Sequence, residues 1–153
     1  MQVVKSHRMR SDCPLNFWVE LLGDKWSLLI IRDLIFFDKH YYGEFLSSME
    51  GISTNILADR LAMLEGEGFI WKDYDREHKQ KIIYRLTEKG IDLLPVIMEI
   101  GLWSDKYALH IPVDKKEMIL KGVKKNRTRA LQAMKKKLYS LHIREKAGNQ
   151  KSR

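Results

Sequence analysis

Residues 51–86, GISTNILADRLAMLEGEGFIWKDYDREHKQKIIYRL, decide the fold of this chain. Their first part predicts a helix that starts after Ser53, a common N-cap residue, and runs to about Glu67. Apolar residues recur there at helical spacing, so one side of this helix should face a core: Ile56, Leu57, Leu61 and Leu64. After Gly68 the pattern becomes that of strands, and residues 69–74 and 81–86 predict a β-hairpin around the polar turn DREHKQ.

The sequence before this stretch predicts further helices. Residues 14–22 begin with a proline, which suits the first turn of a helix, and Gly23 stops that helix. Asp24 then caps a helix over residues 25–37, whose apolar character on nearly every side indicates the buried centre of the fold. We expect a brief strand at residues 41–42, and two helical turns over 43–49 with three apolar residues facing inward: Phe45, Leu46 and Met49.

A second helical region follows the hairpin. Thr87 caps a helix in which residues 91–109 are apolar on more than one face, and Pro95 inside it predicts a kink. A basic amphipathic helix, or two helices interrupted at Gly122, should follow to about residue 141. The chain therefore divides into an N-terminal arm, a mainly α domain with a small β-hairpin (α+β), and a basic helical C-terminal extension: residues 1–12, 13–111 and 112–153.

The positive charge lies in the last part of the chain. Of the 28 Lys and Arg residues, 14 lie in residues 112–153 beside only 3 Asp and Glu, while residues 1–111 hold 14 against 17. The extension is therefore at +11 and the rest at −3, which together give the net charge of +8. A basic surface attracts polyanions such as nucleic acid, but it can also be a solvated helix face.

Several classes of protein are excluded by what the sequence lacks. It has no apolar run long enough to span a membrane, and its first residues lack the apolar centre of a secretory signal, so we expect a cytoplasmic protein. The single cysteine, Cys13, cannot form an internal disulfide, and no histidine pair has the spacing of a metal site. Without a phosphate-binding glycine loop or a nucleophile motif, we expect neither an enzyme nor a bound cofactor.

Helix, turn, helix and hairpin in this order are typical of a winged helix-turn-helix, whose second helix enters the major groove of double-stranded DNA. On a helical wheel of the helix that follows Ser53, one face is free of core residues, and the N-terminal end of this face suits contacts to base edges. Asn55 lies there and can form two hydrogen bonds with adenine. The hairpin loop supplies cations for the DNA backbone. The predicted DNA contacts are Ser53, Thr54, Asn55 and Ala58 on the helix and Arg76, His78, Lys79 and Lys81 on the loop.

Two features of the predicted recognition helix oppose easy DNA binding. Its free face has no Arg or Lys, and Asp59 on that face would repel phosphate. Arg60 falls in the apolar sector of the wheel, so it is either a further DNA backbone contact or an ion-pair partner. The alternative function is therefore a winged-helix module for protein interaction, without sequence-specific DNA binding.

The chain resembles the HxlR-type winged-helix transcriptional regulators, relatives of the MarR-type dimers, from Cys13 to about Tyr107. The motifs that support the resemblance are Gly23-Asp24-Lys25-Trp26, Gly51-Ile52-Ser53, Tyr84-Arg85-Leu86-Thr87-Glu88-Lys89-Gly90 and Leu94-Pro95-Val96-Ile97 with Trp103. The chain departs from the family pattern in its wing, which lacks a proline, and in its recognition helix. The family often has Arg or Gln where this chain has Asn55, Ala58 and Ala62.

The resemblance implies a homodimer on a pseudo-palindromic operator, with the terminal helices of the domain as the interface. The expected interface residues are Phe17, Trp18, Leu94, Ile97 and Trp103. A helix that is apolar on more than one face also needs a second surface, although the basic extension could cover it within one chain. The extension itself lies outside the resemblance, and it either adds nonspecific DNA affinity or wraps the other subunit.

Cys13 has two interpretations. In some relatives the cysteine before this proline senses oxidants or electrophiles, and the start of a helix favours the reactive thiolate. A sensor with one cysteine needs a bond between subunits, a mixed disulfide or an adduct. The alternative is a small buried residue that fills the dimer interface. The sequence identifies no site for a small-molecule effector, which also remains open.

Overall fold

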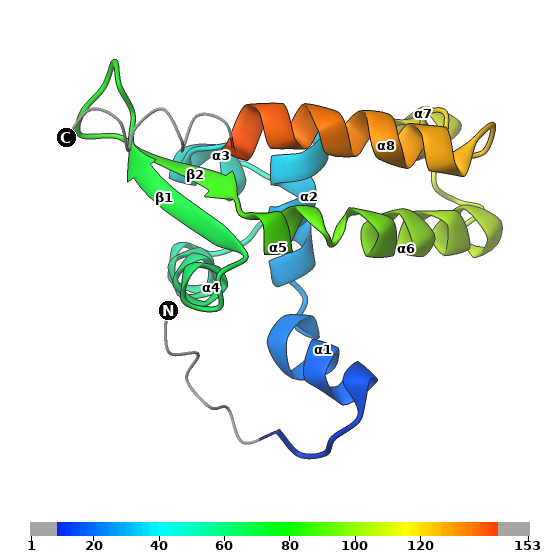
Figure 1. Ribbon diagram of the computed structural model, residues 1–153, viewed down its shortest axis with the longest axis horizontal. Coiled ribbons are helices and arrows are strands. Elements are labelled where there is room, and N and C mark those ends of the chain that lie inside the picture. The colour runs from blue at the N-terminus through cyan, green and yellow to red at the C-terminus, as the bar shows by residue number, and fades with distance from the viewer. Residues whose placement is uncertain (1–8, 144–153) are drawn as a thin grey trace.

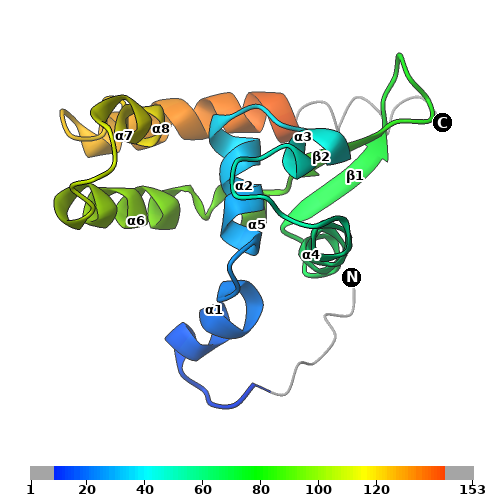
Figure 2. The same ribbon diagram turned by 180° about the vertical axis from the view of Figure 1, so that it is seen from behind.

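The computed structural model describes residues 9–143 as an assembly of helices with one β-hairpin (Figures 1 and 2). Four helices come first, and the hairpin strands β1 (Ile70–Tyr74) and β2 (Ile82–Leu86) follow them. The strands pair antiparallel, with Ile70 opposite Leu86 and Tyr74 opposite Ile82. The helices before the hairpin are α1 (Pro14–Leu22), α2 (Ser27–Phe36), α3 (Tyr42–Leu46) and α4 (Thr54–Gly66).

The helices after the hairpin form a second group. Short α5 (Glu88–Ile91) leads into α6 (Leu94–Tyr107), and α7 (Val113–Leu120) follows at the far end of the molecule. Helix α8 (Arg127–Leu138) then runs back over the domain to a π-helical turn, η1 (Tyr139–Ile143). Among the helices of residues 9–143, none combines the length and the apolar character that crossing a bilayer requires.

Two of the three predicted helix caps, Ser53 and Thr87, are the N-caps of their helices. Ser53 Oγ accepts a hydrogen bond from the N–H of Ile56 over 3.5 Å, and Thr87 Oγ1 accepts one from Gly90 over 3.2 Å. The third is wrong in its position: α2 starts at Ser27, two residues later than predicted, and its N-cap is Trp26. Asp24 Oδ1 still accepts hydrogen bonds from the N–H groups of Trp26 and Ser27 over 2.8 and 3.0 Å. These side chains satisfy N–H groups that have no partner inside a helix.

Helix α2 is the buried centre, as its sequence predicts. Four of its apolar residues are at most 6% exposed: Ile30, Ile31, Leu34 and Ile35. Leu57, Leu61 and Leu64 pack α4 into the same core. Two inward-facing predictions are wrong, because Ile56 is 40% exposed and Met49, in the turn after α3, is 93% exposed.

The predicted strand at residues 41–42 is also wrong. Tyr41 is the N-cap of α3 and Tyr42 is the first residue of that helix. Glu44 Oε2 accepts hydrogen bonds from the N–H groups of His40 and Tyr41 over 2.7 and 3.0 Å, which stabilises the start of a helix rather than an extended segment. Pairing with the sheet is reduced to one bond, from the N–H of Tyr84 to the carbonyl of His40.

Pro95 does not kink a long helix, which corrects a second expectation. The chain forms two helices here, since α5 ends at Ile91 and α6 begins at Leu94. Pro95 therefore lies in the first turn of α6, where its missing N–H would have had no helical partner. The break allows α6 to leave the hairpin in its own direction (Figure 1).

The basic extension forms two helices, one of the two predicted arrangements. Gly122 has a φ of +75° and belongs to the turn that reverses the chain between α7 and α8. Val123 and Leu138 are 2% and 1% exposed and belong to the same core as α2 and α4. The extension is thus packed onto its own chain.

Candidate DNA-binding surface

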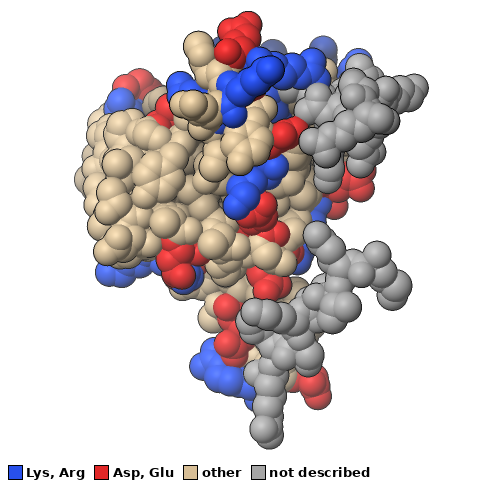
Figure 3. Space-filling view, turned by 90° about the vertical axis from the view of Figure 1, so that its left-hand side faces the viewer, with Lys and Arg blue, Asp and Glu red and all other residues tan. Residues whose placement is uncertain are grey.

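The outer face of α4 is open to solvent. The residues predicted for the free face are all exposed: Thr54, Asn55, Ala58, Asp59 and Ala62. Figure 3 views the side on which α4 and the hairpin lie, and shows a largely uncharged surface with separate positive and negative side chains. Small and amide side chains on an exposed helix can approach base edges closely.

The start of α4 is held by its neighbours. The Tyr42 hydroxyl donates a hydrogen bond to the carbonyl of Thr54 over 2.8 Å, which ties α4 to α3. Ser53 is exposed, but its hydroxyl already caps the helix. The first turn of α4 therefore has a fixed position, and Asn55 within it points away from the core.

Arg60 is an ion-pair partner, one of its two predicted roles. Its guanidinium bonds Asp59 on the same helix and lies 3.6 Å from Asp24, in the turn between α1 and α2. Burial raises the pKa of Asp24, but hydrogen bonds from Ser27 and Trp26 and the charge of Arg60 outweigh it, so this pKa lies below its ordinary value. Asp24 therefore stays ionised and holds α4 against the α1–α2 turn.

The loop of the hairpin has a defined shape, which depends on Asp75. Its Oδ1 accepts hydrogen bonds from the N–H groups of Glu77 and His78 over 2.8 and 3.0 Å. Its Oδ2 accepts one from the hydroxyl of Tyr41 on the body of the domain. The Tyr41 bond, followed by those two N–H groups, lowers the pKa of Asp75 to about 2. The sequence analysis missed both residues, although Asp at the start of a polar turn commonly bonds the N–H two residues on.

The predicted cations of the loop are on the surface. Arg76, His78, Lys79 and Lys81 are all exposed. The Lys81 ammonium lies 4.2 Å from the centre of the Tyr41 ring, a cation–π contact that orients it. The hairpin lies beside α4, and an ion pair of 2.9 Å between Lys72 on β1 and Glu65 on α4 joins the two. The tip of the hairpin projects beyond the body of the molecule (Figure 1).

The base of the hairpin is held by hydrogen bonds to η1. Arg85 Nη1 donates to the carbonyl of Leu141 over 2.9 Å, and the N–H of Leu86 donates to His142 Nδ1 over 3.0 Å. Burial, followed by electrostatic interactions with His40 and Arg85, lowers the pKa of His142 to about 3. Periodicity could not reveal this contact, because it joins segments far apart in sequence.

The predicted dimer residues divide into two groups. Phe17 on α1 and Trp103 on α6 are 51% and 65% exposed, and Trp18 is partly buried. Leu94 and Ile97 are 0% and 7% exposed because they fill the core of their own chain. Within the single chain, the exposed members of the predicted set are therefore Phe17 and Trp103.

Cys13 is exposed and takes the N-cap position of α1. Within residues 9–143 no group of His, Cys, Asp and Glu side chains is arranged to hold a metal ion.

Comparison with known proteins matches the described fold. The HxlR-like helix-turn-helix family model covers residues 21–111. An uncharacterised helix-turn-helix regulator of Synechocystis, sll1512, is 37% identical over 86 residues, which are 56% of this chain and 63% of that protein. The structure of PA1607 superposes with a TM-score of 0.59 at 36% identity, covering 64% of this chain and 67% of that one.

A third relative is the redox regulator HypR in its oxidised form. It matches with a TM-score of 0.55 at 26% identity, over 61% of this chain and 96% of that one. The matched curated relatives are helix-turn-helix regulators of transcription and not enzymes. With a helix-turn-helix, an adjoining hairpin and a family match over more than half of its length, this chain belongs to the HxlR-like helix-turn-helix transcriptional regulators, which are related in structure to the MarR family.

Proposed function

We propose that this protein is a sequence-specific DNA-binding regulator that acts in the cytoplasm as a homodimer on a pseudo-palindromic operator. The observation that supports this best is the exposed face of α4 beside a cationic hairpin loop. Two such helices would occupy successive major grooves about 34–36 Å apart. In this arrangement Thr54 and Asn55 face base edges, and Lys79 meets the DNA backbone.

Selection of genomic fragments by the purified protein, followed by titration of the best fragment, tests this function. The variant Asn55→Ala should lose about 1–3 kcal/mol of specific binding, or roughly 5- to 150-fold in affinity. Gln132→Ala removes an exposed amide from α8 and is the matched control. Equal affinity for all sequences in the native protein would contradict the proposal.

The homodimer is supported by apolar side chains that stay exposed in the single chain. Helix α8 packs on α6 but leaves part of it open, including Trp103 and Tyr107, whose rings lie 5.0 Å apart. Helix α1 adds a second open group. The exposed apolar surface comprises Leu15, Phe17 and Val19 on α1 and Ile100, Trp103 and Tyr107 on α6. Exposed apolar surface of this kind marks an interface.

Thiol chemistry at Cys13 is the regulation that we attach to this function. The thiol is exposed at the start of α1, and α1 contributes to the proposed dimer surface. HypR, a relative, is a redox regulator. Oxidation of Cys13 would therefore add a group, or a bond between subunits, next to the interface that sets the spacing of the two α4 helices.

A protein-interaction module remains the second candidate, and one observation favours it. The only guanidinium on α4 is engaged by Asp59 and Asp24, so the exposed face of the helix offers no cation to DNA. In this case neither Asn55→Ala nor Lys79→Ala would change retention on DNA. Loss of specific binding in either variant would exclude it.

A further inference from the structure

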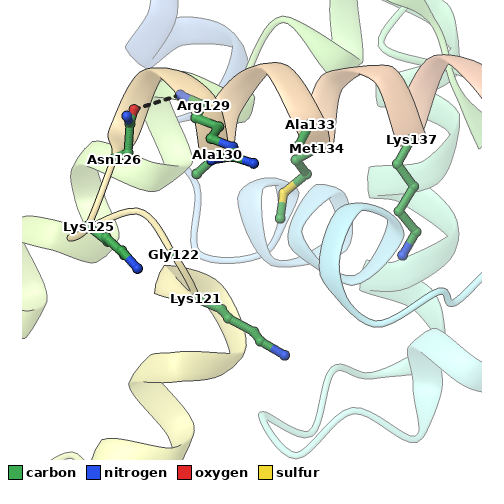
Figure 4. Close-up of a pocket in the computed structure, with 9 residues that line it drawn as sticks. All are labelled: Lys121, Gly122, Lys125, Asn126, Arg129, Ala130, Ala133, Met134 and Lys137. Atoms are coloured by element: carbon green, nitrogen blue, oxygen red, sulfur yellow. Dashed lines mark hydrogen bonds between the residues drawn. The ribbon is translucent and has the colours of Figure 1, made fainter.

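A groove runs along α8 on the side of the molecule shown in Figure 4. It has a volume of about 590 Å³ and extends from the end of α7 to the last turn of α8. The eleven steps from Asn126 to Lys137 correspond to roughly 16 Å of helix. A space of this size and length accommodates an elongated small molecule.

Two sets of cations in the extension differ in their partners. Those of the first set are paired with carboxylates of α6 or of the connection between α5 and α6: Lys124 with Asp105, Arg127 with Glu99, and Lys135 with Asp92, over 2.6 to 2.7 Å. The second set borders the groove, and Figure 4 shows these side chains extending around it: Lys121, Lys125, Arg129 and Lys137. None of this second set forms an ion pair within residues 9–143.

The floor of the groove is apolar. Ala130, Ala133 and Met134 line it at helical spacing, and Ala130 and Met134 also pack against the core. The thioether of Met134 adapts to ligands of different shape. A groove with an apolar floor and cations along its rim matches a ligand that has both an apolar body and a negative charge.

The position of the groove separates it from the proposed DNA contacts. In Figures 1 and 2 the turn between α7 and α8, which contains Lys125, lies at the end of the molecule opposite α4 and the hairpin tip. A duplex held by α4 and the hairpin would therefore not lie on this turn. A DNA backbone would also gain nothing from the apolar floor.

We infer that this groove binds an organic anion with a long apolar body, of the class of fatty carboxylates. The carboxylate accepts hydrogen bonds from Lys125 and Arg129, and Lys121 adds charge at the same end. The chain lies along Ala133 and Met134 towards Lys137. This binding does not depend on DNA binding or on dimer formation.

Calorimetric titration of the full chain with dodecanoate, below its micelle concentration, tests the inference. The double variant K125Q/R129Q should lose about tenfold in affinity, because two charge-assisted contacts are removed. The double variant K115Q/K136Q removes the same charge from exposed positions of α7 and α8 that do not line the groove, and should stay within about twofold.

Three further measurements separate this site from others. Ala133→Phe places a ring in the groove at an exposed position and should abolish binding while circular dichroism stays unchanged. Dodecanol, with no charge, and acetate, with no chain, should each bind far more weakly than dodecanoate. No binding of dodecanoate, equal losses in the two double variants, or equal binding of dodecanol would each overturn the inference.

Discussion

His142 Nδ1 accepts a hydrogen bond from the main-chain N–H of Leu86 over 3.0 Å, although these residues are 56 positions apart. The bond joins η1, in the described part of the basic extension, to the hairpin strand β2. His142 is fully buried, and its ring centre lies 5.4 Å from that of His40. The extension is therefore part of the structure that positions the hairpin loop.

This contact predicts a pH dependence of stability. The pKa of His142 is about 3 in the folded chain, against an ordinary value of 6.5. Between these values the unfolded chain binds a proton at this residue and the folded chain does not. The free energy of unfolding should therefore fall as the pH falls from 6.5 towards 3, by up to about 1.4 kcal/mol per pH unit from this group. Urea denaturation at a series of pH values measures the slope.

The variant His142→Asn is the control for that slope. Its side-chain oxygen can occupy the place of Nδ1 and accept from Leu86, but it does not titrate in this range. We expect a smaller pH dependence below 6.5 with little change at pH 7.5. An unchanged slope would show that other groups cause the effect.

Asp59 is predicted to weaken DNA binding. It lies on the exposed face of α4 and holds the guanidinium of Arg60. Asp59→Asn removes a negative charge and weakens that ion pair, so nonspecific DNA affinity should rise several-fold at low salt. Glu117→Gln removes a charge from an exposed position of α7 and should have little effect. A mobility-shift titration compares the two, and an equal rise in both would point to net charge alone.

Lys79 is predicted to contact a DNA phosphate. Lys79→Ala should lower affinity for all sequences alike and reduce the slope of log affinity against log salt by about 1, because one fewer counterion is released. Lys115→Ala on α7 removes the same charge from an exposed site away from the hairpin. Fluorescence anisotropy over a range of salt concentrations gives both slopes. An unchanged salt slope for Lys79→Ala would show that this side chain does not contact a DNA phosphate.

Trp103 is predicted to hold the dimer together. At 65% exposure it contributes little to the core of its own chain, so Trp103→Asp should fold but dissociate to monomers. Met49→Asp introduces the same charge at a position that is 93% exposed, outside α1 and α6. Sedimentation equilibrium should find Met49→Asp dimeric. A dimeric Trp103→Asp would move the interface elsewhere.

Cys13 is predicted to undergo thiol exchange. Its thiolate attacks the disulfide of oxidised glutathione, which forms a mixed disulfide and releases one glutathione thiolate. Mass spectrometry should show one adduct per chain, and none in Cys13→Ser, since the chain has no other cysteine. DNA affinity should change on treatment of the native protein only. If the adduct forms without a change in DNA affinity, Cys13 is reactive but does not regulate DNA binding.

Local patterns in the sequence were sufficient for most of the elements. Ser53 and Thr87 cap their helices, the hairpin forms at the change of period, and Gly122 separates two helices of the extension. Errors arose where two local signals competed. At Tyr41 the helix capping by Glu44 prevailed over the strand preference of the tyrosines. The helical pattern around Pro95 predicted one long helix, but it is interrupted before Leu94, so that Pro95 lies in the first turn of α6.

Tertiary packing decided which apolar residues of α6 are buried and which are exposed. Leu94 and Ile97 share the apolar pattern of α6 with Trp103, yet the first two are buried within the chain and the third is open. A helical wheel gives the direction of each side chain around one helix, but not which neighbouring helix covers it. The division between buried and exposed apolar residues of α6 therefore required the placement of the helices that pack against it, α2, α7 and α8.

The sequence by itself determined the helix-turn-helix, the hairpin and the exposed face of α4, because these depend on capping, turns and periodicity within short segments. The tertiary structure decided the pairing of Arg60 with Asp24, the contact of His142 with Leu86, and the pairing of Arg127 and Lys135 on α8 with carboxylates of α6 and of the connection before it. These contacts join residues far apart along the chain, whose approach depends on how whole helices pack against one another.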